Sequence, residues 1–180
     1  MLINKISSLG ERGFMKYYNT NIENFVLRET SVEDIQIILS LIKDIAEYEN
    51  MLDQVIATED SLRESIFENN RAKVLLGELD GKVVGYALYF YNFSTFVGRE
   101  GLYLEDIFIN PKVRGKGLGK EIFKVLGKIA KKNGCKRMEW VCLDWNKPSI
   151  NFYKSLGAKA MDEWTIYRLT DNEIEKLSRA

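Results

Sequence analysis

The sequence predicts an α/β fold in which a single mixed sheet is flanked by helices on both faces. Segments with strand character alternate with amphipathic helical segments, in the order β-α-α-β-β-β-α-β-α-β. The chain of 180 residues has the size of one domain, and no internal repeat, low-complexity segment or linker rich in proline or glycine divides it. One sheet covered by helices on both sides is the simplest architecture for this order.

The N-terminal part is predicted to hold a strand followed by a helix. Residues 25–29 have the alternation of a short strand, and Ser31 with the acids after it forms a good N-cap. Apolar side chains then recur at helical spacing up to about Tyr48. Residues 1–24 lack the apolar core and cleavage pattern of a secretory signal, so we expect a flexible tail before a domain of residues 25–180.

The central part is predicted to hold a second helix and three strands. The helix begins at Thr58 and runs through Phe67. Asp80-Gly81 is a two-residue hairpin signal between the first two strands, and Pro111 ends the third. These strands are expected at residues 73–79, 82–93 and 102–109.

The C-terminal part is predicted to hold three helices and two strands. The first helix begins near Gly117 and ends at Gly134, and the second is opened by Pro148 and ended by Gly157. A short third helix begins at Asp171. The strands are expected at residues 138–143 and within residues 158–169.

Histidine is absent from the sequence. This absence excludes Ser-His-Asp and Cys-His hydrolases and metal sites with histidine ligands, so proton transfer falls to carboxylates, tyrosine, lysine or water. The 26 basic residues balance the 26 acidic ones, which gives no support for a nucleic-acid partner held by net charge. The apolar runs are too short for a membrane span, and no membrane partner is expected.

The two cysteines provide no disulfide framework, which fits a reducing compartment, and we expect a cytoplasmic protein that needs no metal. Cys142 lies in a predicted apolar strand and is interpreted as a small core residue, with a covalent acetyl-cysteine as the alternative. Alternating aromatic residues of the central strands are interpreted as sheet packing and not as a binding site. They are Tyr86, Tyr89, Phe90, Tyr91 and Phe93.

A glycine-rich turn, Arg-Gly-Lys-Gly-Leu-Gly, occupies residues 114–119. Gly115, Gly117 and Gly119 let the backbone approach a ligand closely and adopt positive φ. The turn stands at the start of a helix, where unpaired N–H groups and the positive end of the helix dipole form an anion site. The basic residues of the turn are Arg114, Lys116 and Lys120. The turn therefore predicts a site for pyrophosphate.

Two familiar phosphate-binding motifs do not fit this turn. A P-loop ends in Gly-Lys-Ser/Thr, but here Gly119-Lys120 is followed by Glu121, so the hydroxyl that holds magnesium is missing. A Rossmann motif needs Gly-x-Gly-x-x-Gly near the first strand of a βαβ unit, whereas this run is Gly-x-Gly-x-Gly after the fourth strand. A plain strand-to-helix turn with solvated lysines is the remaining alternative, but it needs one glycine and not three.

The pattern Arg-x-x-Gly-x-Gly, after a strand that ends at Ile109 and before a helix, resembles the acetyl-CoA motif of the GNAT superfamily of N-acetyltransferases. The resemblance implies the GNAT fold, with a twisted, mostly antiparallel mixed sheet, and acetyl-CoA as co-substrate.

Four separated motifs look like the spermidine/spermine (diamine) acetyltransferase family within that superfamily. They are residues 41–49, 102–106, 114–119 and 145–154. The polyamine enzymes of the family carry a tryptophan before the Leu-Tyr-Leu-Glu-Asp strand, where this chain has Phe96. Residues 94–96 and 143–146 look more like the sister branch that acetylates thialysine and related lysine-like amines. A diamine or polyamine and a lysine-like amine therefore both stay open as substrates.

The resemblance implies roles for individual residues. The backbone of Ile107 and Ile109 is expected to pair with the pantetheine arm of CoA, and Tyr153 to act as general acid near its sulfur. Glu105 matches a carboxylate that draws the proton from the substrate amine, directly or through water. The other expected CoA contacts are the amides of Arg114, Gly115, Gly117, Gly119 and Lys120, together with Asn146, Ser149 and Lys154. The amine channel is expected to be lined by Tyr48, Glu49, Glu105 and Asp106.

General chemistry supports part of this assignment. An amine with a pKa of roughly 10.4 is protonated at neutral pH and must lose a proton before it attacks, and a carboxylate such as Glu105 can accept that proton. From spacing alone, Tyr153 also fits a core position on its helix. Glu105 and Asp106 are neighbours on a predicted strand, so we expect them to face opposite sides of the sheet.

These inferences predict an enzyme that moves the acetyl group of acetyl-CoA directly to the primary amine of a small cationic substrate in a ternary complex. The resemblance also implies a homodimer. Two alternatives stay open. One is a CoA-binding regulatory module without turnover, and the other is an acetyltransferase of protein N-termini, against which the clustered carboxylates weigh.

Overall fold

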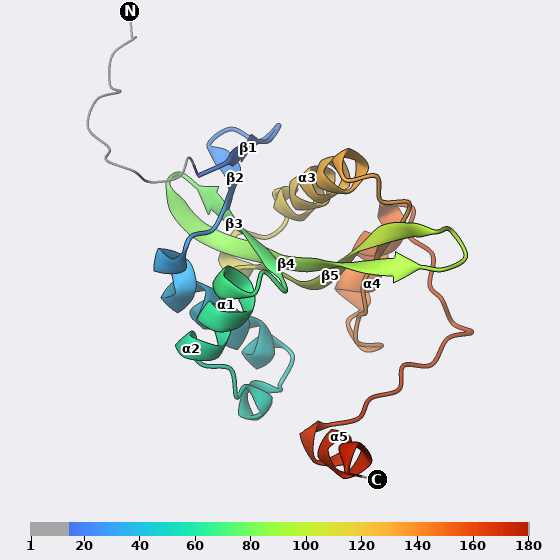
Figure 1. The fold of residues 1–180 in the computed structure, drawn as a ribbon. Helices are drawn as coiled ribbons and strands as arrows, with labels where there is room; N and C mark the ends of the chain where they lie inside the picture. The colour runs from blue at the N-terminus through green and yellow to red at the C-terminus, as the bar shows by residue number, and fades with distance from the viewer. Residues whose placement is uncertain (1–14, 180) are drawn as a thin grey trace, which may run out of the picture. The chain divides into compact units, whose positions relative to one another are not determined.

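The computed structural model describes residues 15–179, which divide into two units after Val141. The first unit contains the sheet and the helices up to α3, and the second contains α4 and α5 (Figure 1).

The sheet has six strands in the order β1-β2-β3-β4-β5-β6, so neighbours in the sequence are also neighbours in space. Adjacent strands are antiparallel as far as β5, and β6 runs parallel to β5. The strands are β1 (Tyr17–Asn19), β2 (Phe25–Glu29), β3 (Lys73–Leu79), β4 (Lys82–Ser94), β5 (Arg99–Ile109) and β6 (Met138–Glu139). The predicted mixed, mostly antiparallel sheet is confirmed.

The helical segments follow the predicted order. They are η1 (Val32–Asp34), α1 (Ile35–Tyr48), η2 (Leu52–Gln54), α2 (Glu59–Leu62), the π-helical η3 (Arg63–Glu68), η4 (Pro111–Val113), α3 (Leu118–Lys132), α4 (Lys147–Ser155) and α5 (Asp171–Ser178). No helix within residues 15–179 combines the length and the apolar character needed to cross a membrane.

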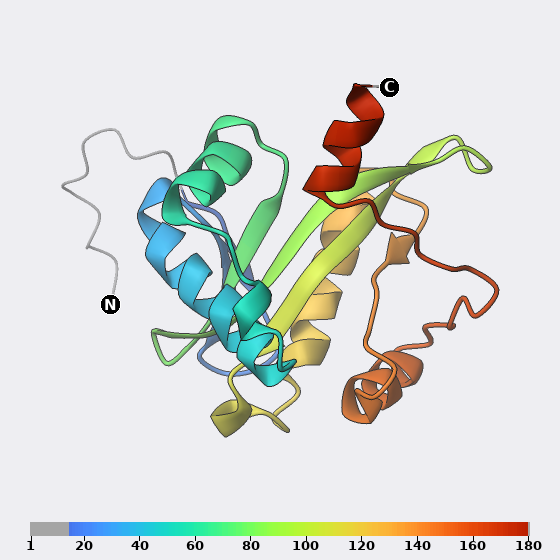
Figure 2. The same cartoon turned by 90° about the horizontal axis from the view of Figure 1, so that it is seen from below.

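Helices cover both faces of the sheet, as predicted. α1 and α2 lie on one face and α3 lies on the other (Figures 1 and 2). The core on the α1 side consists of Ile38, Leu41, Ile66, Val74, Leu76, Tyr86 and Phe108. The residues that α3 buries include Leu118, Ile122, Val125, Leu126 and Ile129. Removal of these apolar side chains from water is the main force that holds the layers together.

β1 lies inside the segment that was predicted as a flexible tail. It pairs with β2, with Tyr17 opposite Arg28 and Asn19 opposite Val26. The Asn21 N–H then donates a hydrogen bond at 3.1 Å to the buried Glu121 carboxylate of α3. Strand pairing therefore begins before residue 25, and the rest of the predicted tail, residues 1–14, lies outside the described residues.

The C-terminal strands differ from their prediction. The strand expected at residues 138–143 is reduced to β6, and residues 158–169 form no strand. A strand needs a neighbour that completes its ladder of hydrogen bonds, and alternation along one segment does not show whether that neighbour is there. Cys142 is half-buried and lies beyond β6, so its assignment to a strand was wrong.

Candidate active site

The glycine-rich turn connects the end of β5 to the start of α3. The Asn110 side-chain oxygen accepts a hydrogen bond from the Lys112 N–H at 3.0 Å and caps η4. Gly115 and Gly117 have φ values of 79° and 82°, a left-handed conformation in which a side chain is strained. Gly117 is the N-cap residue of α3, and Gly119 lies in its first turn. The backbone conformation alone therefore accounts for Gly115 and Gly117.

The first turn of α3 has the properties of an anion site. The first N–H groups of a helix have no partner within it, and the helix dipole places its positive end there. Lys120 is exposed in this turn, and Lys116 is exposed just before the N-cap residue Gly117. This geometry is what the predicted pyrophosphate site requires.

The Arg114 side chain ties the turn to α1 and β5. Its Nε donates a hydrogen bond to the Ile109 carbonyl oxygen at 2.8 Å. Its guanidinium carbon lies 4.5 Å from the centre of the Tyr48 ring and 5.6 Å from that of Phe108. Cation–π contacts at exposed positions contribute about 0.5–1 kcal/mol. The Arg114 N–H donates to the Pro111 carbonyl oxygen at 3.3 Å at the end of η4, and its expected contact with CoA stays a prediction.

β5 has one edge that is only partly paired. β4 pairs with it along its whole length, but β6 pairs with it only at Leu102 and Tyr103. Over residues 105–109 no strand of the described chain lies at this second edge. Backbone groups of alternate residues point to the same edge, so Ile107 and Ile109 present theirs together. The predicted pairing with the pantetheine arm needs such an edge.

A β-bulge at Glu105 changes the direction of the acidic side chains. Leu88 pairs with Asp106 and Tyr89 pairs with Leu104, which leaves Glu105 as the extra residue. Alternation from Tyr103 places Glu105 on the face of Phe90 and Leu88. Asp106 lies opposite Leu88 and therefore on that same face. The expectation that Glu105 and Asp106 face opposite sides was wrong, because the bulge breaks the alternation between them.

Two carboxylates interact on this face, which α1 covers. They belong to Asp106 and to Glu49, the C-cap residue of α1. Burial raises the pKa of Glu49, and the negative charge of Asp106 raises it further. Burial also raises the pKa of Asp106, although the Tyr86 hydroxyl, which donates to Asp106 Oδ2 at 3.0 Å, acts in the opposite direction. Partly desolvated carboxylates that repel each other are stabilised by a cation placed between them.

Tyr86 and Asp44 belong to the same electrostatic group but were not among the predicted site residues. Tyr86 is 0% exposed, and its pKa is raised well above the ordinary value by burial and then by the charges of Asp106, Glu49 and Asp44. An aromatic residue on a strand has the same pattern whether or not its hydroxyl is bonded, so Tyr86 was assigned to packing. Its position diagonally across from Asp106 would have been the signal, and that position depends on the bulge.

The remaining predicted residues lie on α4, in the second unit. Asn146 is the N-cap residue, and its side-chain oxygen accepts a hydrogen bond from the Ser149 N–H at 3.3 Å. Tyr153 is half-buried beside Phe152, with ring centres 5.6 Å apart, and Lys154 is exposed in the last turn. The roles of these residues toward CoA and the leaving thiolate stay predictions.

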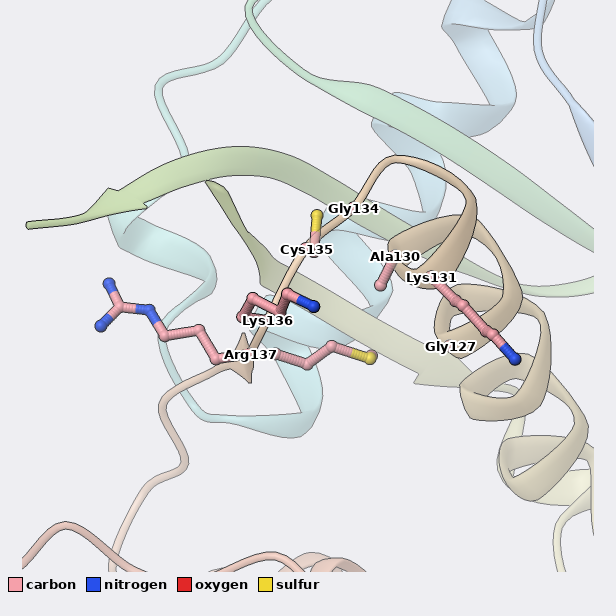
Figure 3. Close-up of a pocket in the computed structure, with 8 residues that line it drawn as sticks. Gly127, Ala130, Lys131, Gly134, Cys135, Lys136 and Arg137 are labelled. Atoms are coloured by element: carbon pink, nitrogen blue, oxygen red, sulfur yellow. The ribbon is translucent and has the colours of Figure 1, made fainter. Parts of the chain in front are cut away.

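Two cavities of the first unit lie away from the predicted residues. One, of about 440 Å³, lies at the C-terminal end of α3 (Figure 3) and is lined by Gly127, Ala130, Lys131, Gly134, Cys135, Lys136, Arg137 and Met138. The other, of about 380 Å³, lies between the start of β3 and the same end of α3, and Lys16, Lys73, Tyr89 and Lys132 are among its lining residues. Neither cavity contains a residue of the predicted site.

Residues 38–158 match the model of the acetyltransferase (GNAT) family. The chain belongs to this family. The predicted superfamily and the predicted N-acetyltransferase activity are thereby confirmed, and enzymes of this family use acetyl-CoA as co-substrate.

Individual relatives support the same placement. Thialysine N-epsilon-acetyltransferase of Bos taurus is 38% identical over 165 residues, which cover 85% of this chain and 96% of the relative. L-ornithine N5-acetyltransferase NATA1 of Arabidopsis thaliana is 38% identical over 63% of this chain and 50% of its own length. Spermidine/spermine N(1)-acetyltransferase-like protein 1 of Homo sapiens is 33% identical over 86% of this chain and 24% of its own length.

A solved structure agrees with the fold. The integron cassette protein VCH_CASS6 from the mobile metagenome of V. cholerae superimposes with a TM-score of 0.73 at 26% identity. The match covers 87% of this chain and 99% of that protein.

Proposed function

We propose that this acetyltransferase moves the acetyl group of acetyl-CoA directly to a primary amine of a small cationic substrate in a ternary complex, and that a lysine-like amine such as thialysine is preferred. The observation that carries the proposal is the group of carboxylates on the face covered by α1. It consists of Glu49, Glu105 and Asp106, and the Arg114–Tyr48 contact joins that face to the anion-binding turn.

The chain offers acetyl-CoA contacts of two kinds. The amides of the turn and of the first residues of α3 hold the pyrophosphate, and the open edge of β5 holds the pantetheine arm. The residues assigned to these contacts are Ile107, Ile109, Arg114, Gly115, Gly117, Gly119 and Lys120, with Asn146, Ser149 and Lys154 added from α4. When bound, acetyl-CoA supplies the thioester whose acetyl group is transferred.

Two protons must move during the transfer. Glu105 accepts the proton that the substrate ammonium loses, directly or through water, and the amine nitrogen then forms the C–N bond as the C–S bond breaks. Tyr153 gives its proton to the departing thiolate. A phenol of pKa about 10 and a thiol of pKa about 8.5 differ by ~1.5 units, or ~2 kcal/mol, which is a small cost. Solvent then restores the phenol proton.

The substrate class follows from the carboxylates that are not needed for proton transfer. Glu49 and Asp106 are partly buried carboxylates that a bound cation would stabilise. We therefore assign them to binding of the distal positive charge of the substrate. A lysine-like amine and a diamine both carry such a charge. The names of the relatives from Bos taurus and Arabidopsis thaliana favour the amino-acid type of substrate.

The decisive experiment measures release of free thiol from acetyl-CoA by the purified full chain. Thialysine, lysine, ornithine, putrescine and spermidine are compared at equal concentration, and the highest kcat/KM is expected for thialysine. Calorimetry with CoA is the control for a folded cofactor site. If CoA binds but no amine causes thiol release, the proposed acetyl transfer to small amines is contradicted and a regulatory module is supported. Release with peptides alone would support acetylation of protein N-termini.

Two variants test the proton-transfer roles. Glu105→Gln is expected to lower kcat by about 10²–10⁴, because the amine loses its proton acceptor. Tyr153→Phe is expected to lower kcat with little change in the affinity for CoA. If either variant keeps the wild-type kcat, the substituted residue does not have the proposed role in proton transfer.

We also propose that the protein is a cytoplasmic homodimer, on the basis of the family resemblance. Sedimentation velocity of the full chain at micromolar concentration should show a species of twice the monomer mass. Fractionation of cells that express the tagged chain should recover it in the cytoplasmic fraction.

A further inference from the structure

The Tyr86 side chain makes a polar contact that core packing does not require. It is 0% exposed within the apolar core on the α1 side, yet its hydroxyl donates to Asp106 Oδ2 at 3.0 Å. A phenylalanine would fill the same space. A buried tyrosine hydroxyl usually bonds a partner, and here that partner is a carboxylate of the amine site.

The contact depends on the local architecture of β4 and β5. Tyr86 lies opposite Phe108 and Leu88 lies opposite Asp106, so Tyr86 and Asp106 are diagonal neighbours on one face. Diagonal neighbours lie within reach of an aromatic side chain. In regular pairing continued from Tyr89 and Leu104, Glu105 would lie opposite Leu88, and Asp106 would lie one position further along, on the other face. The bulge therefore brings Asp106 to Tyr86.

Apart from the bond to Tyr86, the surroundings of Asp106 disfavour its ionised form. Asp106 is largely removed from water, and Glu49 carries a like charge close enough to interact with it. The other charged groups on this face are Asp44 of α1, Glu105 of the bulge and Arg114, which lies over Tyr48 and Phe108. A hydrogen bond from Tyr86 to Oδ2 stabilises the ionised form and restricts the orientation of the carboxylate.

We infer that Tyr86 is a positioning residue of the amine site, which holds the Asp106 carboxylate ionised and oriented for the distal ammonium group of the substrate. The inference rests on the proposed function, because it assigns the cation that Asp106 receives. It predicts that loss of one buried hydroxyl weakens the use of cationic amines without weakening the site for CoA.

The test compares Tyr86→Phe with Tyr89→Phe. Tyr89 lies on the same strand, is 3% exposed and, by alternation, faces the other side of the sheet, so it controls for the loss of a buried hydroxyl. Tyr86→Phe is expected to lower kcat/KM for thialysine by roughly tenfold to a hundredfold, mainly through KM, with unchanged CoA affinity. Because Tyr86 lowers the pKa of Asp106, the acid limb of the kcat/KM profile should also move to higher pH. Tyr89→Phe should change neither quantity.

A double-mutant cycle with Asp106→Asn separates positioning from packing. If Tyr86 acts through the carboxylate, Tyr86→Phe should have little further effect on kcat/KM in the Asp106→Asn background. Equal effects in both backgrounds, or an unchanged acid limb in Tyr86→Phe, would overturn the inference. Thermal unfolding of each variant shows whether a loss of activity reflects a loss of folded protein.

A wild-type chain that acetylates no amine would refute the proposed function but not this inference. The Asp106 carboxyl carbon is then followed by NMR as the pH is raised. A titration at higher pH in Tyr86→Phe than in the wild type supports the role of Tyr86. Equal titrations overturn it.

Discussion

Among the described residues of the first unit, Asp34 with Glu78 and Glu49 with Asp106 are two pairs of acidic side chains in which burial acts on at least one carboxylate, and the fold compensates their charges in opposite ways. Beside η1 and β3, Asp34 and Glu78 share one arginine, Arg28. It bonds both Asp34 oxygens, at 2.7 and 2.8 Å, and Glu78 Oε1 at 2.6 Å. On the α1 face, Glu49 and Asp106 face each other's charge, and the bond to Asp106 comes from a neutral phenol.

The pKa shifts express this difference. Burial acts to raise the pKa of Asp34, but the hydrogen bonds from Arg28 and from the Ser31 N–H outweigh it, and the pKa is lowered. The pKa values of Glu49 and Asp106 are raised. A group of charges that is neutralised within the fold stabilises the fold, whereas a group with raised carboxylate pKa values favours binding of a cation from outside.

Removal of Arg28 should have the largest effect on stability, because Asp34 and Glu78 share this one cation. Arg28→Met should leave Asp34 and Glu78 without their cation and destabilise the protein by about 3–5 kcal/mol. Urea unfolding followed by circular dichroism measures the change. Activity per folded molecule should stay at the wild-type level. Arg28→Lys keeps the charge but not the paired hydrogen bonds, so its loss of unfolding free energy should be smaller than that of Arg28→Met. A loss below about 1 kcal/mol in Arg28→Met would contradict a structural role for this group.

Amide substitutions in the two groups should have opposite effects on stability. Asp34→Asn should destabilise the protein by about 1–3 kcal/mol at neutral pH, because a charged hydrogen-bond acceptor of Arg28 is lost. Asp106→Asn should leave stability equal to or above that of the wild type, because a carboxylate with a raised pKa costs stability when it is ionised. Its KM for the amine should rise. Stability loss in both variants would show that the two groups are alike.

The dependence on pH has the opposite sign in the two groups. The contribution of Asp34 is present above the unfolded pKa of about 3.9 and is lost as pH falls through the lower folded pKa. The cost of Asp106 is absent below about 3.9 and develops as pH rises through the higher folded pKa. Urea midpoints of the wild type and of each variant, measured from about pH 3 to about pH 8 and so on both sides of the unfolded carboxyl pKa, give both differences.

The smallest expected effects concern two glycines of the α3 region. Gly117→Ala should cost about 1 kcal/mol, because φ is 82°, and should weaken CoA binding measured by calorimetry. Gly127 lies in the middle of α3 and has no atom within 4 Å of an added Cβ. Gly127→Ala should therefore stabilise the helix by roughly 0.5–1 kcal/mol with unchanged CoA affinity. Equal CoA affinity in both variants would contradict a cofactor role for the turn.

Features that depend on a few neighbouring residues could be predicted from the sequence. The hairpin at Asp80-Gly81 is an example, since both residues adopt positive φ, at 51° and 74°. The glycine-rich turn is another, because its left-handed residues and its position at a helix start are local properties. The family resemblance rests on such segments, and the comparisons confirm it.

Features that depend on a partner far along the chain could not be predicted in this way. β1 forms because β2 lies beside it, and residues 158–169 form no strand despite their pattern. The shared face of Glu105 and Asp106 arises from one extra residue in the pairing of β4 with β5. The residue types around Glu105 do not predict a bulge. The bond between Tyr86 and Asp106 follows from the same register.

The sequence by itself determined the class of this protein: its main helices, its hairpin, its acetyltransferase family and its glycine-rich turn, all of which depend on short-range patterns. Only the tertiary structure decided which acidic side chains lie on the same face and how far each is removed from water. Strand register placed Glu105 and Asp106 on one face, packing of α1 added Glu49, and burial of Tyr86 supplied a hydrogen-bond donor. The physical reason is that the charge state of a carboxylate depends on its distance from water and from other charges, and folding sets both distances.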